Sequence, residues 1–335
     1  MSEKNERLIF DVAYQPQVRT TVDTRRLMSD VIVAMIPVAI VAVYRYGWHV
    51  LVLMLTGMAS ATFFEWAYRR LLHKSITIDD YSAAVSGLLL VMVLPPQTPW
   101  WMIVIGTFFA IVVVKQLYGG IGKNFLNPAL AGRAFLTASY AGTLTVVIID
   151  GTTMATPLSY LYGENPLPFT VAQNFLGKIP GSIGEISSLA ILLGAAYLIV
   201  RKVIRWRIPA CVIGSVALIS LVCGHAGYGR VEWMLHNVLS GGVMFTGIFM
   251  ATDYATSPVT RWGQAIYGIG IGALTMLIRY FGGFAEGCSY AILIMNLTTW
   301  AIDKACHRHQ FGVSKEDIAA EKAAKKAAKA KKEAV

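Results

Sequence analysis

The chain has 335 residues, of which 56% are hydrophobic and only 14% are charged, and its mean hydropathy is +0.56. Because soluble globular domains carry about a quarter charged residues, these values exclude an ordinary water-facing surface and predict an all-α polytopic membrane protein. The net charge of +10 does not indicate nucleic-acid binding, because the basic residues lie in short loops and in the tail. The four cysteines are scattered singly, which argues against a zinc site or an iron–sulfur cluster held by this chain alone.

Apolar runs recur along the chain, and most are long enough to cross about 30 Å of hydrocarbon as a helix. Ten transmembrane helices are predicted, at about 27–44, 48–68, 82–94, 100–117, 125–149, 186–200, 208–226, 235–251, 264–281 and 287–302. The third span is short and ends at Pro95-Pro96. The fifth holds Asn127-Pro128 near its start and Arg133 within it.

The distribution of lysine and arginine predicts the orientation of these spans. Nearly all of the lysines and arginines lie in the N-terminus, in alternate loops and in the tail, so both termini are expected in the cytoplasm. This gives a cytoplasmic arm at 1–26, a transmembrane domain at 27–305 and a basic cytoplasmic tail at 306–335. The loop at about 150–185 is then expected on the outer face.

Matching small-residue motifs divide the spans into two halves. Ser86-Gly87 and Ser240-Gly241 each begin a short apolar stretch, and the glycine pairs Gly119-Gly120 and Gly282-Gly283 follow downstream. Two halves of five spans must be inverted relative to each other, because five is odd. Inverted repeats with broken helices bind ligands near the middle of the membrane, where unwound backbone faces a cavity.

Polar residues within or beside the apolar spans are candidates for a binding site, because polar groups in a membrane are costly. They are Asn124, Asn127, Arg133, Asp253 and Thr256. Helix capping and interhelical hydrogen bonding explain each of them equally well. Asparagine amides suit the pyrimidine edge of a flavin, and they also suit urea or an amide solute. Asp253 is a candidate carboxylate of an ion pathway or, as an alternative, a capping residue.

The stretch Asp150–Leu158, DGTTMATPL, is rich in hydroxyl groups and opens the longest loop between spans. Its composition alone is typical of an ordinary turn. Together with GGIGKNFLNPALAGRAFL at Gly119–Leu136 and ATDYATSPVT at Ala251–Thr260, it resembles the membrane flavoprotein family shared by two redox pumps. The family members are RnfD of the Rnf complex and NqrB of the sodium-pumping NADH:quinone reductase.

The resemblance implies two cofactors. In the family an S/T-x-A-T turn carries covalent FMN on its last threonine, which corresponds to Thr156 here. The surrounding Asp150, Gly151, Thr153 and Ala155 would then form the cofactor-binding loop, in which Met154 stands where the family usually has glycine. The family also holds a non-covalent riboflavin among its helices, expected here beside Asn124 and Asn127. No metal and no catalytic residue are assigned to the chain.

The short N-terminal arm and modest length make the chain most similar to RnfD of the Rnf ferredoxin:NAD oxidoreductase complex. The resemblance implies a multi-pass subunit of the bacterial cytoplasmic (inner) membrane that carries electrons between an outer-face FMN subunit and a cytoplasmic NAD-binding subunit. Electron flow in the complex would drive export of Na⁺ or H⁺. The alternatives are NqrB of the quinone reductase, or a channel or transporter for a small solute with a similar inverted-repeat fold.

Overall fold

The computed structural model describes residues 23–144, 147–149, 152–154, 156–163, 167–224, 227–282 and 286–306. These residues are mostly helical. The exception is a short antiparallel hairpin of β1 (Val147–Ile149) and β2 (Thr152–Met154), in which Ile148 lies opposite Thr153.

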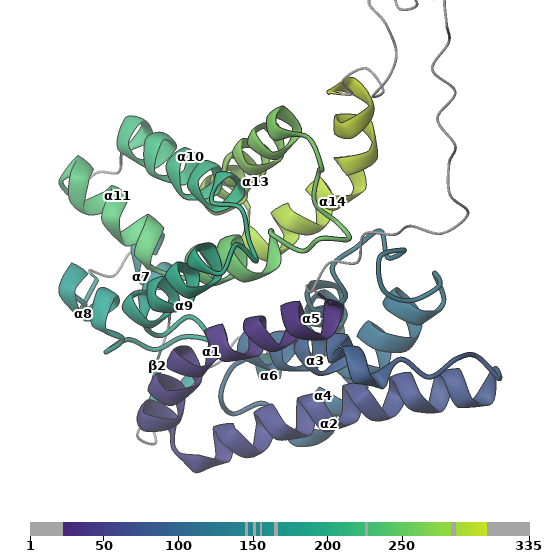
Figure 1. Ribbon diagram of the computed structural model, residues 1–335. Helices are drawn as coiled ribbons and strands as arrows, with labels where there is room; N and C mark the ends of the chain where they lie inside the picture. The colour runs from purple at the N-terminus through teal and green to yellow at the C-terminus, as the bar shows by residue number, and fades with distance from the viewer. Residues whose placement is uncertain are drawn as a thin grey trace, which may run out of the picture.

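The first half of the chain forms one group of helices (Figure 1). Its elements are α1 (Thr24–Tyr46), α2 (Trp48–Leu71), the short turn η1 (Ile78–Asp80), α3 (Ser82–Met92), α4 (Trp100–Phe108), the π-helical continuation η2 (Phe109–Gln116), α5 (Pro128–Ser139) and α6 (Ala141–Leu144). Helix α3 begins where the Asp80 carboxylate accepts hydrogen bonds from the Ser82 backbone N–H (2.8 Å) and hydroxyl (2.6 Å). Such side-chain acceptors satisfy the free N–H groups of a first turn.

The second half forms the other group. Its elements are α7 (Pro157–Leu161), α8 (Val171–Leu176), α9 (Ser188–Val200), α10 (Arg207–Cys223), α11 (Arg230–Leu239), α12 (Val243–Phe245), the π-helical continuation η3 (Thr246–Met250), α13 (Arg261–Phe281) and α14 (Cys288–Ala305). Threonines begin three of these helices, because the side chains of Thr156, Thr170 and Thr260 accept backbone hydrogen bonds at the starts of α7, α8 and α13.

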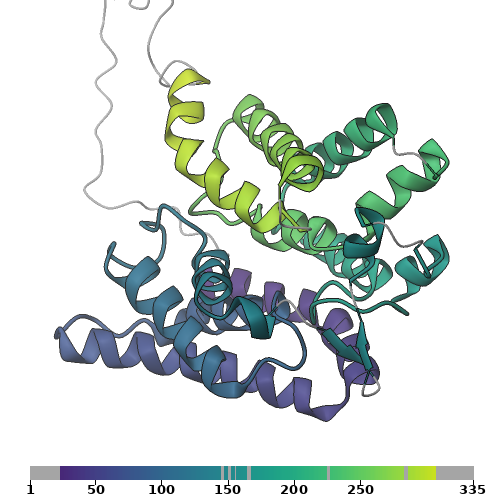
Figure 2. The same cartoon turned by 180° about the vertical axis from the view of Figure 1, so that it is seen from behind.

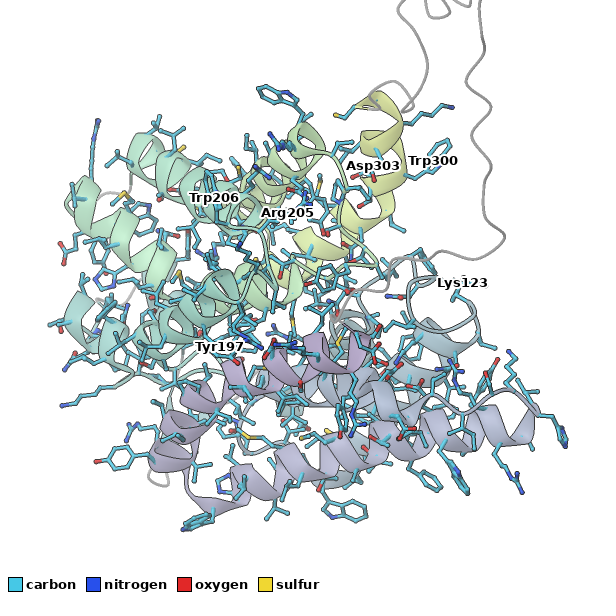
Figure 3. All side chains as sticks on the ribbon, viewed as in Figure 1. Lys123, Tyr197, Arg205, Trp206, Trp300 and Asp303 are labelled. Atoms are coloured by element: carbon cyan, nitrogen blue, oxygen red, sulfur yellow. The ribbon has the colours of Figure 1, made fainter. Side chains whose placement is uncertain are left out.

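Helices α1 and α9 join the two groups, as the two opposite views show (Figures 1 and 2). Gly194 of α9 lies so close to α1 that a Cβ on it would stand 2.3 Å from the Ala34 carbonyl oxygen. At one end of this contact the Tyr197 hydroxyl donates to Asp30 (2.9 Å), and Arg201 pairs with the same carboxylate at 3.1 Å (Figure 3). A small residue at a helix crossing allows such close backbone approach.

The centre of the molecule holds the two broken helices, α3 and η3. All five residues of η3 are buried, as is the second half of α3. The loop before α9 contacts the ends of both. The Ile183 and Gly184 N–H groups donate to the carbonyls of Leu94 (3.0 Å) and Met92 (2.6 Å) after α3. A Cβ on Gly242, at the start of α12, would lie 2.8 Å from Glu185 Oε1.

Two of the described helices, α1 and α2, are long and apolar enough to cross a membrane, and α3, α4 with η2, α9 and α10 are shorter apolar helices. Large apolar side chains are exposed on several helices, among them Ile40, Trp48 and Leu218. Trp300 of α14 is another (Figure 3). Such exposure is unusual for a protein in water, but it suits a protein surrounded by lipid.

Two predicted spans differ from the helices that form. The fifth, predicted at 125–149, is helical only from Pro128 to Ser139, and the chain then enters α6 and the β1–β2 hairpin. The eighth, predicted at 235–251, is broken between α11 and α12, where Gly241 adopts a positive φ of 72°. Glycine enters this left-handed region without steric cost, so the helix ends there.

Candidate functional site

Thr156 lies at the start of α7, on the wall of a small pocket in the loop region. Its Oγ1 accepts the Ser159 N–H at 3.4 Å and lies 3.0 Å from the Ser159 hydroxyl, so it caps the helix. The residue is half-buried, whereas the following Pro157 and Leu158 are buried and hold it in place. The hydroxyl predicted to carry FMN therefore lies beside a cavity on a fixed piece of backbone.

We call it the outer pocket, after the outer-face position that the sequence predicts for its loop, and its space including the open mouth is about 250 Å³. It is lined by Thr156, Pro157, Leu158, Ile179, Pro180, Gly181, Glu185, Gly241 and Glu286. Of the other predicted residues of the FMN loop, Asp150, Gly151 and Ala155 lie outside the described residues. Thr153 is described only as backbone, as the central residue of β2.

Two carboxylates and one arginine lie beside the outer pocket. The Arg133 guanidinium pairs with Glu286, donates to the Ser289 hydroxyl at 2.7 Å and lies 3.9 Å from Glu185. Burial raises the pKa of the Glu185 carboxyl well above its usual range, and Glu286 raises it further. Burial would also raise the pKa of Glu286, but the charge and hydrogen bond of Arg133, together with Glu185 and the Arg279 charge, lower that pKa.

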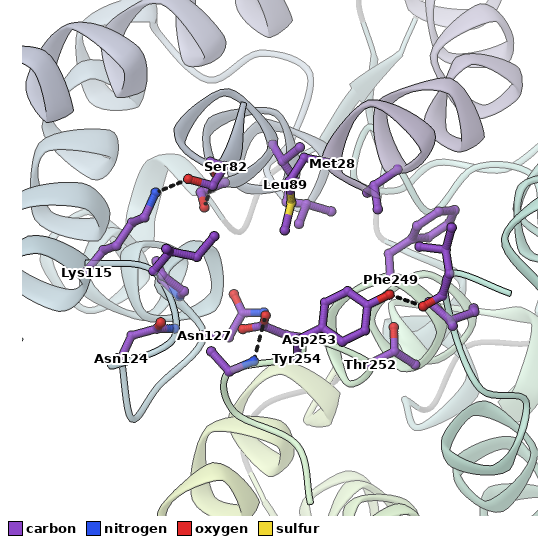
Figure 4. A pocket seen from close by; sticks show the side chains of 18 of the residues that line it. Met28, Ser82, Leu89, Lys115, Asn124, Asn127, Phe249, Thr252, Asp253 and Tyr254 are labelled. Carbon is purple, nitrogen blue, oxygen red and sulfur yellow. Dashed lines mark hydrogen bonds between the residues drawn. The ribbon is translucent and has the colours of Figure 1, made fainter. Parts of the chain in front are cut away.

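A larger cavity, called the inner cavity below, lies at the start of α3 and the end of η3 (Figure 4). Its volume, including its open mouth, is about 750 Å³. Its walls are mostly apolar and come from both halves of the chain, for example Val85 and Leu89 of α3 and Phe249 of η3. The predicted site residues Asn124, Asn127 and Asp253 all line this cavity, so the structure brings them together.

The amide of Asn127 already makes several hydrogen bonds. Its Oδ1 accepts the Ala129 and Leu130 N–H groups at 3.0 and 3.3 Å and so caps α5. Its Nδ2 donates to the Met250 carbonyl at 3.2 Å, which ties the start of α5 to the end of η3. Asn127 therefore has the capping role that the sequence left open, and it also faces the cavity.

Asp253, like Asn127, lines the inner cavity and also stabilises the local backbone. Its carboxylate accepts the Ala255 N–H at 3.4 Å and the Thr256 hydroxyl at 3.3 Å, so it closes the turn that follows η3. The Asn124 amide donates to the Leu126 carbonyl at 3.0 Å within its own turn. Both residues thus stabilise the loops that form the cavity wall.

Lys115 is the cationic side chain that lines the inner cavity. Its Nζ donates to the Ser82 hydroxyl at 2.7 Å (Figure 4) and to Glu65 Oε2 at 2.8 Å. Glu65 is almost fully buried and also lies 3.5 Å from Arg69. Burial of these charges is possible because they are paired.

The two pockets share helix α5. Asn127 at its start lines the inner cavity, and Arg133 lies six residues further, beside the outer pocket. At 1.5 Å per residue this separation is about 9 Å along the helix. The outer pocket and the inner cavity therefore lie next to each other, at two positions along α5.

Sequence reasoning did not select Glu65, Lys115, Glu185, Glu286 or Arg279 as site residues. Glu65 and Lys115 carried a usable signal, because each lies within an otherwise apolar stretch. Glu185 and Glu286 lie in loops, where a carboxylate is ordinary, and nothing local shows that both meet Arg133.

A family model described as the NQR2, RnfD, RnfE family matches residues 11–312. The chain is 44% identical over 315 residues to the D component of the Na⁺-translocating ferredoxin:NAD⁺ oxidoreductase complex of Acetobacterium woodii, covering 92% of this chain and 97% of that protein. It is 39% identical over 320 residues to the D component of the proton-translocating ferredoxin:NAD⁺ oxidoreductase complex of Clostridium ljungdahlii, covering 91% and 96%. The D component of the ion-translocating oxidoreductase complex of Shewanella frigidimarina is 35% identical over 350 residues, with 91% and 99% covered. The chain therefore belongs to the NQR2, RnfD, RnfE family.

Proposed function

We propose that this chain is the RnfD membrane subunit of an Rnf-type ferredoxin:NAD oxidoreductase, a redox-driven ion translocase. In this proposal it carries electrons across the membrane through FMN bound covalently to Thr156 and riboflavin bound in the inner cavity. The observation that carries the proposal is the half-buried Thr156 hydroxyl at the outer pocket, above a cavity reached along the same helix. The names of the relatives support the choice of complex over the quinone reductase and over a solute channel.

The residues of the outer pocket fit a group attached to Thr156. Glu185 Oε1 in the pocket lining and Arg279 Nε behind Gly241 are buried polar atoms that make no hydrogen bond with any described residue. Native proteins rarely leave such atoms without a partner. A phosphoester at Oγ1 replaces only the hydroxyl hydrogen and leaves the oxygen able to accept the Ser159 N–H, so the cap of α7 can persist.

The inner cavity fits a second, non-covalent flavin. Apolar walls with a few polar groups are typical of sites for small organic ligands. In this proposal Leu89 and Phe249 exclude water from a flat ring, and Asn124 and Lys115 orient its polar edge. A bound flavin supplies one- and two-electron chemistry.

We also propose that the chain crosses the membrane ten times as two inverted halves of five spans. The contacts of α2 with α3 and α4 are paralleled by those of α10 with η3 and α13, and α1 packs against α9. These parallels support a repeat, and the basic loops support cytoplasmic termini in a multi-pass protein of the bacterial inner membrane. The proposed partners are an outer-face FMN subunit and a cytoplasmic NAD-binding subunit.

The proposal is tested by flavin fluorescence of the denatured chain on a gel, after expression together with the rest of the complex and the flavin transferase. The wild-type band should fluoresce, Thr156→Val should be dark, and Thr156→Ser should keep fluorescence because it keeps the hydroxyl. Thr170→Val is the matched control, since Thr170 also caps a short helix of the same loop region. A dark wild-type band, or a fluorescent Thr156→Val band, would contradict the proposal.

A further inference from the structure

Arg279 is a buried cation in the last turn of α13 with only neutral hydrogen-bond partners. It is 3% exposed. Its Nη1 donates to the Asn237 carbonyl at 2.6 Å, and its Nη2 donates to the Ser240 carbonyl at 3.3 Å. Among the described residues no carboxylate lies within ion-pairing distance of it, and its Nε makes no hydrogen bond. A buried charge without a counter-charge is costly, so this position favours binding of an anion.

Arg279 does not itself line the outer pocket, but it lies directly behind Gly241, which does. A Cβ on Gly241 would lie 3.2 Å from Arg279 Nη2 and 3.3 Å from Leu158 Cδ2. Gly241 and Leu158 both line the outer pocket together with Thr156. Because glycine has no side chain, it leaves the guanidinium close to the pocket, where a larger residue would cover it.

Arg133, a half-buried arginine of this region, is less suited to bind a further anion. It already pairs with Glu286 and lies 3.9 Å from Glu185. If all four side chains were charged, the two arginines would balance the two carboxylates. The raised pKa of Glu185 favours its neutral form, which leaves this group of side chains with one excess positive charge.

We infer that Arg279 supplies the counter-charge for the phosphodiester that joins FMN to Thr156. The inference rests on the proposed function, because it requires a phosphate at Thr156. A phosphodiester carries one negative charge and two free oxygens, which match the excess charge and the forked donors of a guanidinium. Arg279 is then a cofactor-binding residue that holds the phosphate rather than the flavin ring.

The test is a thermodynamic cycle in the purified complex, with thermal midpoints measured for wild type, Arg279→Gln, Thr156→Val and the double variant. In the flavinylated chain Arg279→Gln should lower the midpoint by about 3 °C or more, because it leaves the phosphate unpaired. In the Thr156→Val background the same change should cost little or stabilise, because it removes an uncompensated buried charge. A difference between the effects of Arg279→Gln in the two backgrounds reports a direct interaction between Arg279 and the group on Thr156.

A purely structural role for Arg279, through Asn237 and Ser240, would give the same loss in both backgrounds, and this additive result would overturn the inference. Arg279→Lys keeps the charge and should retain most of the midpoint of wild type. If Arg279→Gln does not fold, Arg279→Met, which removes the charge but keeps an extended side chain, carries the cycle. Arg230→Gln, the same change at an exposed position of α11, should be neutral in both backgrounds. Gel fluorescence separates the two claims. A dark wild-type band refutes the proposed function together with the inference, whereas a fluorescent band with an additive cycle refutes the inference alone.

Discussion

Glu185 lies in a loop, but it behaves as a buried residue of the core. It is 3% exposed and lies between the end of α3 and the start of α12, where Gly242 leaves room for its carboxyl group. Arg133 is the arginine that lies beside both Glu185 and Glu286, and its ion pair with Glu286 is the closer of the two. The two carboxyl groups therefore differ in protonation, with Glu286 ionised and Glu185 favouring the neutral form.

This difference predicts a pH dependence of stability. The pKa of Glu185 is higher in the folded chain than its ordinary value of 4.5. Its contribution to stability is therefore complete below that ordinary value and is lost as the pH rises toward the folded pKa, at about 1.4 kcal/mol per unit of elevation. Glu185→Gln should flatten this fall in thermal midpoint and leave the variant more stable than wild type in neutral buffer.

Glu232→Gln is the matched control for that experiment, because Glu232 lies on α11 with more than half of its side chain exposed. It should leave the pH profile of the thermal midpoint unchanged. If the pH profile of Glu185→Gln is the same as that of wild type, Glu185 is ionised in the folded chain and not neutral.

At the scale of single residues, the sequence identified side chains that carry a local signal. Asn127 precedes a proline at the start of a helix, and Asp253 follows an apolar stretch, so both were recognisable, and both line the inner cavity. Glu185, Glu286 and Arg279 acquire their positions only from the tertiary fold. Arg133 and Glu286 are 153 positions apart in the chain, so no local pattern could pair them.

Among the helices, close contacts at glycines determine how neighbouring helices pack, both between the two groups of the fold and within one of them. Gly194 lies at the crossing of α9 with α1, and Gly87 at the crossing of α3 with α2, where a Cβ would stand 2.2 Å from the Gly57 carbonyl oxygen. Within lipid, helix association depends on such packing, because apolar burial between helices gains little.

Gly194→Ala should therefore separate α9 from α1 and destabilise the chain by about 1–3 kcal/mol, the usual cost of overpacking. Gly214→Ala in α10 is the matched control, because a Cβ there meets nothing within 4 Å. It should be neutral or slightly stabilising, since alanine favours helices by up to about 1 kcal/mol over glycine. Thermal midpoints of both variants in the same detergent check this, and equal midpoints would contradict the importance of the α1–α9 crossing.

The position of most helices was predictable from apolar runs, but hydropathy alone missed two of their breaks, although the Ser240-Gly241 motif marked one of them. Hydropathy extended the fifth span to residue 149, because Val147–Ile149 is as apolar as a helix, yet these residues form a strand of a hairpin. It also merged α11 with α12, because a positive φ at Gly241 has no signature in hydropathy. The irregular segments are the ones that form the pockets, so the site was less predictable than the fold.

Across the whole molecule, the two halves of the chain converge on two pockets at different depths. The start of α3, the end of η3 and the start of α5 enclose the inner cavity, while α7 and the loop before α9 enclose the outer pocket. The proposed transfer of electrons across a membrane needs such a succession of sites, and it gives the Thr156 hydroxyl beside the outer pocket a chemical role besides capping α7. The central claim is thus the chemical state of Thr156.

The most direct measurement is mass spectrometry of the proteolytic peptide that contains Thr156, taken from the complex purified from its native host. The account predicts a peptide heavier by the mass of FMN less one water, with the added group on Thr156 and not on Thr152 or Thr153. An unmodified peptide, or a flavin on another residue, would contradict it.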